Sequence, residues 1–531
     1  MRILRLFPVL LMMFAASAMH KTSAQTAAPA AEQAGPYGSL VIRNVTVIDG
    51  SGAPAFGPAD VFIKGNRIER VALADAIALN RDNIVTADGS TAAKPDREID
   101  GKGMYIMPGL IDAHIHINAT KDLPAEYIYK LLLGHGVTTI RTFNVAKGSP
   151  KEMVAEKKRS AANQIIAPRM YVYPFWGRAE DPRFSTPDGA RQIVDEWHAD
   201  GVDGIKIIGK PGLWPDVFRS ITSEARKNGM GVAVHIGQDG VYPMNAVRVA
   251  ADGASTIEHH YGYAESSFTD RNIQDLPVAY NYSSEPDRFL ETGRVWLQAD
   301  LAKLHGEVIQ SLLDSNRTNG FIMVPTFSIY EANRDVTRAA NLPWHSVYTL
   351  PVLMDSFLPN PAHHASYFYE WTSNKEADWA RAYRRWLDFV NDYKNQGGVV
   401  AVGSDTGFLF SVWGFGTIRE LEMLEEAGFS PLETIHAATE NGAKVVKNPE
   451  LGLVRPGYLA DLVVLTDNPL ADVKIFYGTG VTRVGQDRKE VHEQCVKFTI
   501  RDGVVFDSQA LLRDVREMVA KAKQARPAKS N

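Results

Sequence analysis

Cysteine is nearly absent from this 531-residue chain, which contains Cys495 and no other. One thiol excludes an intramolecular disulfide, and it excludes a metal site built from several thiolates. An excess of one charge is also lacking, since 57 Lys and Arg stand against 62 Asp and Glu and leave a net charge of -5. This balance gives no electrostatic support for binding nucleic acid.

The N-terminal apolar run over residues 6–16 is too short to span a membrane. Arg2 and Arg5 precede it, and small residues typical of a cleavage site follow. The pattern predicts a signal peptide over 1–24, then a disordered leader over 25–37 rich in Ala, Thr, Gln and Pro. We therefore expect a protein exported to a periplasm or secreted, with a retained N-terminal anchor helix as the alternative.

Both ends of the remaining chain have the alternating pattern of short β-strands. The segments are 39–49, 60–71, 460–465 and 496–506, with Gly65-Asn66 as a hairpin turn. They predict one β domain built from 38–107 and 448–510, and two separate β appendages are the alternative. Residues 511–531 are expected to form a C-terminal helix or tail.

The middle of the chain alternates between strand-like and helical segments. Eight candidate strands are 104–113, 137–141, 169–173, 204–208, 231–234, 255–258, 321–325 and 399–403. Eight such alternations predict an α/β fold, a (β/α)8 barrel over 108–447. The stretch 334–396 is far longer than a normal loop, so we expect it to be an inserted lid.

The most informative stretch is Pro108-Gly-Leu-Ile-Asp-Ala-His-Ile-His116. His114 and His116 are two residues apart, so an extended backbone points both imidazoles the same way. This arrangement suits a divalent metal ion.

The ends of other strands also carry ionisable groups, and barrel chemistry is found at strand ends. These groups are Lys206 on the fourth strand, His235 after the fifth, the pair His259-His260 after the sixth, and Asp405 after the eighth. Adjacent strand residues face opposite sides, so only one histidine of the pair is expected to be a ligand.

Three of these residues have alternative interpretations. His235 is either a ligand or a core histidine whose hydrogen bonds are satisfied. Lys206 lies between isoleucines, so its amine either meets a buried acidic partner or has reacted with carbon dioxide to give a carbamate that bridges two metals. With histidines on three other strands, we favour the carbamate. Asp405 is either a ligand or a helix N-cap, because a helical segment follows it.

These motifs resemble the amidohydrolase superfamily, in particular its imidazolonepropionase-like and prolidase-like branch. The resemblance rests on the stretch 108–116, on Gly136 to Arg141, on Ile257-Glu-His259, on Gly403-Ser-Asp405 and on 457–465. It implies a distorted (β/α)8 barrel with a composite β-sandwich, and it favours His259 over His260. After Arg141 the chain departs from the family pattern.

The resemblance also implies a dinuclear site. His114, His116 and Asp405 would hold one metal, His235 and His259 the other, and carboxylated Lys206 would bridge them. Zinc is the default ion for a hydrolytic site rich in histidine. Two divalent metals would acidify a bridging water, and Asp405 would act as general base and then general acid on an amide bond.

Aromatic residues at the expected mouth of the site favour a substrate with an apolar or aromatic group. Candidate contacts are Tyr173, Trp176, His260, Tyr261 and Tyr330, and Arg141 and Arg178 are candidates for a carboxylate. Alternatively, many of these aromatics pack the barrel core, and the arginines have surface roles.

The leading hypothesis is an exported metal-dependent hydrolase of the amide bond in N-acyl amino acids or dipeptide-like small molecules. The alternatives are a mononuclear cyclic-amide hydrolase or deaminase, and a non-catalytic binding protein on the same fold. Dimers are the commonest soluble assembly, so a homo-oligomer is the default expectation.

Overall fold

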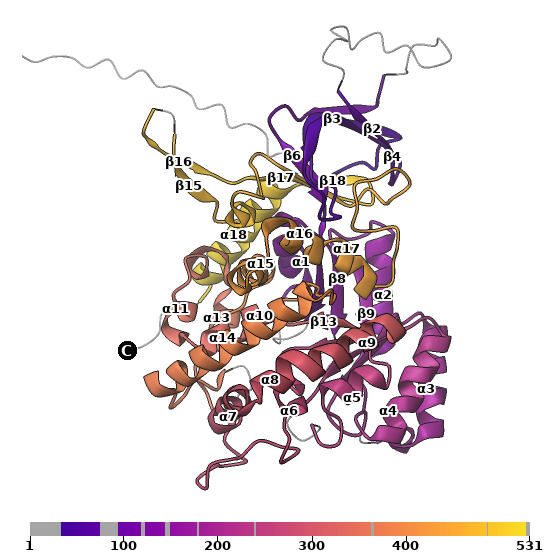
Figure 1. The fold of residues 1–531 in the computed structure, drawn as a ribbon. Helices are drawn as coiled ribbons and strands as arrows, with labels where there is room; N and C mark the ends of the chain where they lie inside the picture. Colours follow the sequence, from indigo (N-terminus) through magenta and orange to yellow (C-terminus); the bar gives the residue numbers. More distant parts are fainter. Residues whose placement is uncertain are drawn as a thin grey trace, which may run out of the picture. The chain divides into compact units, whose positions relative to one another are not determined.

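A computed structural model describes residues 33–74, 94–117, 123–143, 149–177, 180–237, 241–362, 366–485 and 487–526 (Figure 1). The predicted signal peptide and Arg178 lie outside the described residues. The end of the predicted leader is ordered, because Gln33–Ala34 forms β1 and pairs antiparallel with β18 (Val504–Asp507). None of the described helices is long and apolar enough to cross a membrane.

The two ends of the chain meet in one nine-stranded sheet, drawn in indigo and yellow in Figure 1. Its order is β1-β18-β17-β14-β6-β2-β3-β4, with β5 paired to β2. The remaining bounds are β2 (Ser39–Val47), β3 (Phe56–Lys64), β4 (Arg67–Leu73), β5 (Arg97–Asp100), β6 (Tyr105–Pro108), β14 (Leu462–Leu465) and β17 (Val496–Arg501). The interpretation as two separate appendages is therefore wrong.

The alternation of apolar and polar residues along these strands explains how the sheet forms its apolar core. Leu40 and Ile42 of β2 are buried with Val61 and Ile63 of β3, and all four belong to one apolar cluster. The predicted hairpin turn at Gly65 joins β3 to β4, and its φ of 58° suits glycine.

The predicted first barrel strand is divided in two. β6 belongs to the nine-stranded sheet, whereas β7 (Leu110–Ile115) pairs with β8 (Val137–Phe143). Gly109 separates them, and a Cβ there would lie 2.1 Å from Thr138 Oγ1. Only glycine fits this close approach, so the chain passes directly from the sheet into the barrel.

Seven parallel strands form two arcs of the barrel, β7-β8-β9 and β10-β11-β12-β13. The remaining bounds are β9 (Arg169–Tyr173), β10 (Gly204–Ile208), β11 (Gly231–His235), β12 (Thr256–Glu258) and β13 (Ile322–Val324). A bridge between Phe175 and Lys206 joins the arcs.

The eighth predicted strand, 399–403, closes the ring without being a regular strand. Val400 bridges Met323 of β13, and Ala113 of β7 donates its N–H to the carbonyl of Val402 at 2.9 Å. The structure therefore confirms the predicted order of eight barrel segments, although the eighth segment, 399–403, pairs irregularly with its neighbours.

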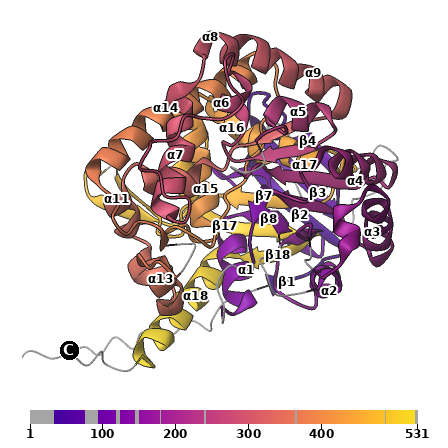
Figure 2. The ribbon, with the colours of Figure 1, turned by 90° about the horizontal axis from the view of Figure 1, so that it is seen from below.

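Helices surround the barrel strands in the view from below (Figure 2). Their bounds are α1 (Ala125–Gly134), α2 (Pro150–Ala161), η2 (Pro182–Ser185), α3 (Pro187–Asp200), α4 (Pro215–Lys227), α5 (Ala246–Ala251), α6 (Tyr263–Ser266), α7 (Glu285–Gln298), α8 (Leu301–Lys303), η3 (Leu304–Val308), α9 (Ile309–Asn319), α10 (Phe327–Tyr330), η4 (Glu331–Asn333), α11 (Val336–Ala340), α12 (His345–Tyr348), α13 (Pro351–Phe357), α14 (Ser373–Asn395), α15 (Phe415–Ala427), α16 (Pro431–Ala438), α17 (Glu440–Val445), η6 (Val473–Phe476) and α18 (Ser508–Gln524). A small hairpin, β15 (Val481–Val484) with β16 (Glu490–Glu493), extends from the upper left of the molecule in Figure 1. The predicted C-terminal helix is α18, which packs beside α1.

The predicted lid over 334–396 contains α11 to α14, and α14 packs along α7 and α15. Trp379, Trp386 and Tyr383 of α14 are fully buried. Most of this stretch is therefore part of the barrel's helical layer.

A buried carboxylate with three arginine partners fixes the chain after β13. Glu331 in η4 accepts hydrogen bonds from Arg419 of α15 at 2.5 and 2.7 Å, and it also pairs with Arg334 and Arg338. Burial alone would raise the pKa of Glu331, but the three arginines outweigh it and lower the pKa to about 2.

We expect Glu331→Gln to lower the free energy of unfolding by about 2 kcal/mol near neutral pH, because it removes the charge of a buried carboxylate that pairs with three partly exposed guanidinium groups. Since the folded-state pKa is depressed, this stabilisation is complete above the ordinary carboxyl pKa and is lost as the pH falls toward 2. Thermal unfolding of both proteins between pH 7 and pH 3 measures the difference.

Asp314→Asn, which removes an exposed partner of Arg317, is the control and should change stability little. An equal effect of the two substitutions, or a Glu331 effect independent of pH, would contradict this account.

Candidate metal centre

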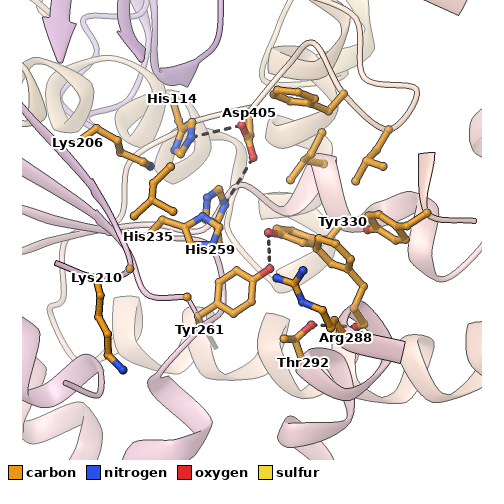
Figure 3. Close-up of a pocket in the computed structure, with 18 of the residues that line it drawn as sticks. His114, Lys206, Lys210, His235, His259, Tyr261, Arg288, Thr292, Tyr330 and Asp405 are labelled. Atoms are coloured by element: carbon orange, nitrogen blue, oxygen red, sulfur yellow. Dashed lines mark hydrogen bonds and ion pairs between the residues drawn. The ribbon is translucent and has the colours of Figure 1, made fainter. Parts of the chain in front are cut away.

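Six predicted ligands converge at the carboxyl ends of the barrel strands. They are His114 on β7, His116 just beyond it, Lys206 on β10, His235 at the end of β11, His259 after β12 and Asp405 after the closing segment. All six line one pocket of about 720 Å³, and Figure 3 labels each of them except His116.

Asp405 is at the centre of this cluster. Its Oδ1 lies 3.0 Å from His116 Nε2 and 3.4 Å from His114 Nε2, and its Oδ2 lies 3.8 Å from His259 Nδ1. One ligand atom from each of His114, His259 and Asp405 lies within 4.8 Å of the others. A single ion could contact all three.

His235 and Lys206 extend the cluster on the side of β10 and β11. The ring of His235 lies 4.5 Å from that of His259, and Lys206 Nζ lies 4.2 Å from the ring centre of Phe143. Burial lowers the pKa of Lys206 to about 8, so a substantial share of its amine is neutral in mildly alkaline solution.

The donor set fits metal ions. Burial lowers the pKa of His235 and His259 well below the usual value and keeps both imidazoles neutral. Burial alone would raise the pKa of Asp405, but His114 and His116 outweigh it, so the carboxylate is ionised. His114 Nε2, Lys206 Nζ and Asp405 Oδ1 are buried without a well-formed hydrogen bond. Neutral imidazoles, a carboxylate and unsatisfied buried atoms are what a divalent cation requires.

Three residues with left-handed backbone conformations shape the cluster. They are His259, Thr326 and Asp405, with φ of 67°, 53° and 51°. The Thr326 hydroxyl lies 2.6 Å from His259 Nδ1. Such conformations cost on the order of 1–3 kcal/mol each and are common at functional sites.

The conformation of His259 changes which residues face the pocket. Glu258 is the last residue of β12 and contacts His114 inside the barrel. Strict alternation would point His259 outward, but its positive φ turns the side chain back toward Asp405. His259 rather than His260 is therefore the histidine of the adjacent pair that joins the cluster.

Arg141 does not line the pocket, contrary to its proposed contact with substrate. Its guanidinium donates to Glu258 Oε1 at 2.8 Å, to Thr256 at 2.8 Å and to the Ala113 carbonyl at 2.5 Å. Glu258 Oε2 lies 2.5 Å from His114 Nδ1. This chain of contacts orients His114 so that Nε2 faces Asp405.

Of the other predicted substrate contacts, Tyr261 and Tyr330 line the pocket and their hydroxyls lie 3.0 Å apart. Tyr173, Trp176 and His260 are buried elsewhere, so the alternative of core packing applies to them. Tyr173 fills the space above Gly204, where a Cβ would lie 2.2 Å from its ring.

Trp176 and His260 are packed among other aromatic rings. Trp176 contacts Phe184 and Trp197. His260 stacks on Tyr261 at 4.2 Å and lies against Trp379 and Trp386 of α14, and burial lowers its pKa to about 3. It therefore connects the end of β12 to the surrounding helices.

The sequence analysis missed most of the outer wall of the pocket. Besides His259 and Tyr261, eight lining residues come from the segment between β12 and β13, and Tyr367 is the one described lining residue from the predicted lid. The eight are Ile273, Gln274, Leu276, Tyr280, Tyr282, Arg288, Phe289 and Thr292. The long gap between the sixth and seventh predicted strands could have indicated this second insertion.

We expect Glu258→Gln to weaken metal binding by 10- to 100-fold, because the neutral amide no longer fixes the tautomer of His114. Competition with a coloured chelator measures the affinity. Glu420→Gln is the matched control, since Glu420 is also buried but accepts the N–H groups of Phe327 and Ser328. Equal affinity in the parent and Glu258→Gln would contradict the positioning role.

Short stretches of the chain match proteins of known activity. One stretch is similar to an adenine deaminase from Methanoculleus marisnigri (54% identity over 44 residues, 8% of each chain). Another alignment joins the chain to an ochratoxinase from Aspergillus niger (41% identity over 83 residues, 15% of this chain and 16% of the relative). The alignments thus cover less than a fifth of either relative.

Solved structures match over most of the chain. The Aspergillus niger ochratoxinase structure has a TM-score of 0.57 at 18% identity and covers 89% of this chain and 96% of its own. A Xaa-Pro dipeptidase gives 0.56 at 19%, covering 88% and 100%. These likenesses establish the fold, a (β/α)8 barrel with a β-sandwich. The model of the amidohydrolase family matches residues 105–295 and 373–505, so the chain belongs to the amidohydrolase family.

Proposed function

We propose that this protein is a metal-dependent hydrolase of the amide bond in N-acyl amino acids or dipeptide-like small molecules. The observation that carries the proposal is the convergence of four histidines, Lys206 and Asp405 at one buried cluster inside a large pocket. Family membership and the hydrolase names of its structural neighbours support it.

The residues of the cluster have different roles in the proposed hydrolysis. His114, His116 and Asp405 would hold one divalent ion, most simply zinc, and His235 and His259 a second, with a carbamate on Lys206 between them. When bound, such ions supply an acidified water and a polarised carbonyl group. Asp405 is ionised, so it can accept the proton of the attacking water and deliver it to the leaving nitrogen.

The pocket walls support an apolar or aromatic group on the substrate. Tyr261, Tyr330 and Phe289 line the space beside the cluster. Large rings of this kind exclude water and favour apolar ligand surface.

A mononuclear cyclic-amide hydrolase or deaminase is the second candidate. It is favoured by the match to adenine deaminase and by the three-ligand cluster of His114, His259 and Asp405. In that case Lys206 would carry no carbamate.

We expect the parent protein, prepared with bicarbonate and zinc, to hold two metal equivalents and to cleave N-acyl amino acids. Lys206→Ala should hold one equivalent or fewer and lose the hydrolysis, because no ligand would bridge the ions. Elemental analysis gives the metal content, and amine release from a panel of N-acyl amino acids gives the activity.

Lys447→Ala is the matched control, since burial also lowers the pKa of Lys447 and its amine donates to the Met230 carbonyl, away from the cluster. It should behave like the parent. One equivalent in both the parent and Lys206→Ala, with activity retained, would favour the mononuclear candidate.

We also propose export, supported by Arg2 and Arg5 before the apolar run 6–16. The expected result is a periplasmic or secreted protein whose first residue, by N-terminal sequencing, follows Ala18 or Ala24. Retention of Met1 on a cytoplasmic protein would overturn the proposal.

A further inference from the structure

The charge of the pocket indicates an anionic group on the substrate. Among the described residues that line the pocket, the charged side chains are Lys206, Lys210, Arg288 and Asp405. Lys206 and Asp405 belong to the metal cluster, which leaves Lys210 and Arg288 as charged groups in the outer part. Both are cations, so the outer pocket favours a negatively charged ligand.

Arg288 is held in a defined place by the start of α7. Ser284 caps this helix by accepting the N–H of Asp287 at 3.3 Å, and the N–H of Arg288 donates to the Ser284 carbonyl at 3.0 Å. Arg288 is thus in the first turn of a 14-residue helix. A helix holds a binding group more precisely than a loop does.

The side chain of Arg288 points toward the metal cluster. In Figure 3 its guanidinium points toward Tyr261 and Tyr330, whereas Lys210 extends away from the histidines. The rings of Tyr261 and Tyr330 lie 6.1 and 5.7 Å from the ring of His259. One layer of tyrosine therefore separates Arg288 from the ligands of the metal centre.

The order of these groups, from metal ligands to tyrosines to Arg288, fits the chemistry of an amino acid. In an N-acyl amino acid the carboxylate is separated from the scissile amide by the length of one backbone residue, about 3.5 Å in an extended chain. A guanidinium binds a carboxylate through two parallel hydrogen bonds, which fixes direction as well as charge. Phe289, stacked on Tyr367 at 3.9 Å, adds an apolar surface next to Arg288.

We propose that Arg288 binds the free α-carboxylate of the amino acid released by hydrolysis. This inference rests on the proposed function and narrows it. The enzyme cleaves the amide bond next to a terminal carboxylate and discriminates against the same bond when that carboxylate is masked. Arg288 comes from the insertion between β12 and β13, so the insertion determines this specificity.

The test compares an N-acyl-phenylalanine with its C-terminal amide. In the parent, kcat/KM for the acid should exceed that for the amide by 10- to 100-fold, the range for a hydrogen-bonded charge. In Arg288→Met this ratio should fall toward one, mainly through a higher KM for the acid. Arg288→Lys keeps the charge without the paired geometry and should give an intermediate ratio.

Arg294→Met is the matched control, since Arg294 lies on the same helix but pairs with Asp378 and does not line the pocket, and it should keep the parent's ratio. Lys210→Met removes the other outer cation and should lower the ratio less than Arg288→Met does. Calorimetric binding of phenylalanine and phenylalaninamide provides a readout without turnover, and Arg288→Met should weaken binding of the acid alone. An equal kcat/KM for acid and amide in the parent, or loss of discrimination in Lys210→Met instead, would overturn the role of Arg288.

The outcomes also separate this inference from the proposed function. Hydrolysis of both compounds at equal rates would retain amide hydrolysis and refute Arg288 as the carboxylate site. Hydrolysis of neither compound by the metal-loaded parent would refute the proposed function for this substrate class. In that case the binding measurements still test Arg288. Equal affinity of the parent for phenylalanine and phenylalaninamide would refute its role. Tighter binding of phenylalanine by the parent, but not by Arg288→Met, would support it.

Discussion

The carboxylate of Glu258 is the contact on which the site's geometry depends. It is fully buried between Arg141 and His114, and an ionised group in such a place is stable only when its partners satisfy it. Burial alone would raise the pKa of Glu258, but Arg141, Lys206 and His114 outweigh it and hold the pKa well below its usual range. The same charge therefore stabilises the barrel interior and fixes the direction of a metal-facing imidazole. Both the packing of the barrel and the chemistry at its mouth therefore depend on the Glu258 carboxylate.

Much of the fold could be predicted because its signals are local in the sequence. Strand and helix patterns alternate along the chain, and the carboxyl ends of parallel strands meet at one face, so the residues at those ends were expected to meet. The structure brings together His114, His116, Lys206, His235, His259 and Asp405 as this reasoning requires. The nine-stranded sheet was also predictable in outline, since both ends have the same alternating pattern.

What could not be predicted depends on contacts between distant residues or on backbone conformation. Arg141 resembles a substrate-binding arginine until its partner on β12 is known, and Tyr173 resembles a pocket aromatic until Gly204 is seen beneath it. The left-handed conformation of His259 breaks the two-residue period on which the facing argument relied. The insertion after β12 has no regular pattern in its first half, so its position over the pocket follows from tertiary packing alone.

The connection of β6 to β14 has a consequence for biosynthesis. Pro108 pairs with Leu462, which the ribosome adds 354 positions later. At 5–20 residues per second, roughly 20 to 70 seconds pass before this partner strand is made. During that time the β2–β6 edge of the sheet has unpaired backbone groups that invite pairing with other chains. The nascent chain therefore needs either a chaperone on this edge or a barrel that folds first and brings β14 into place.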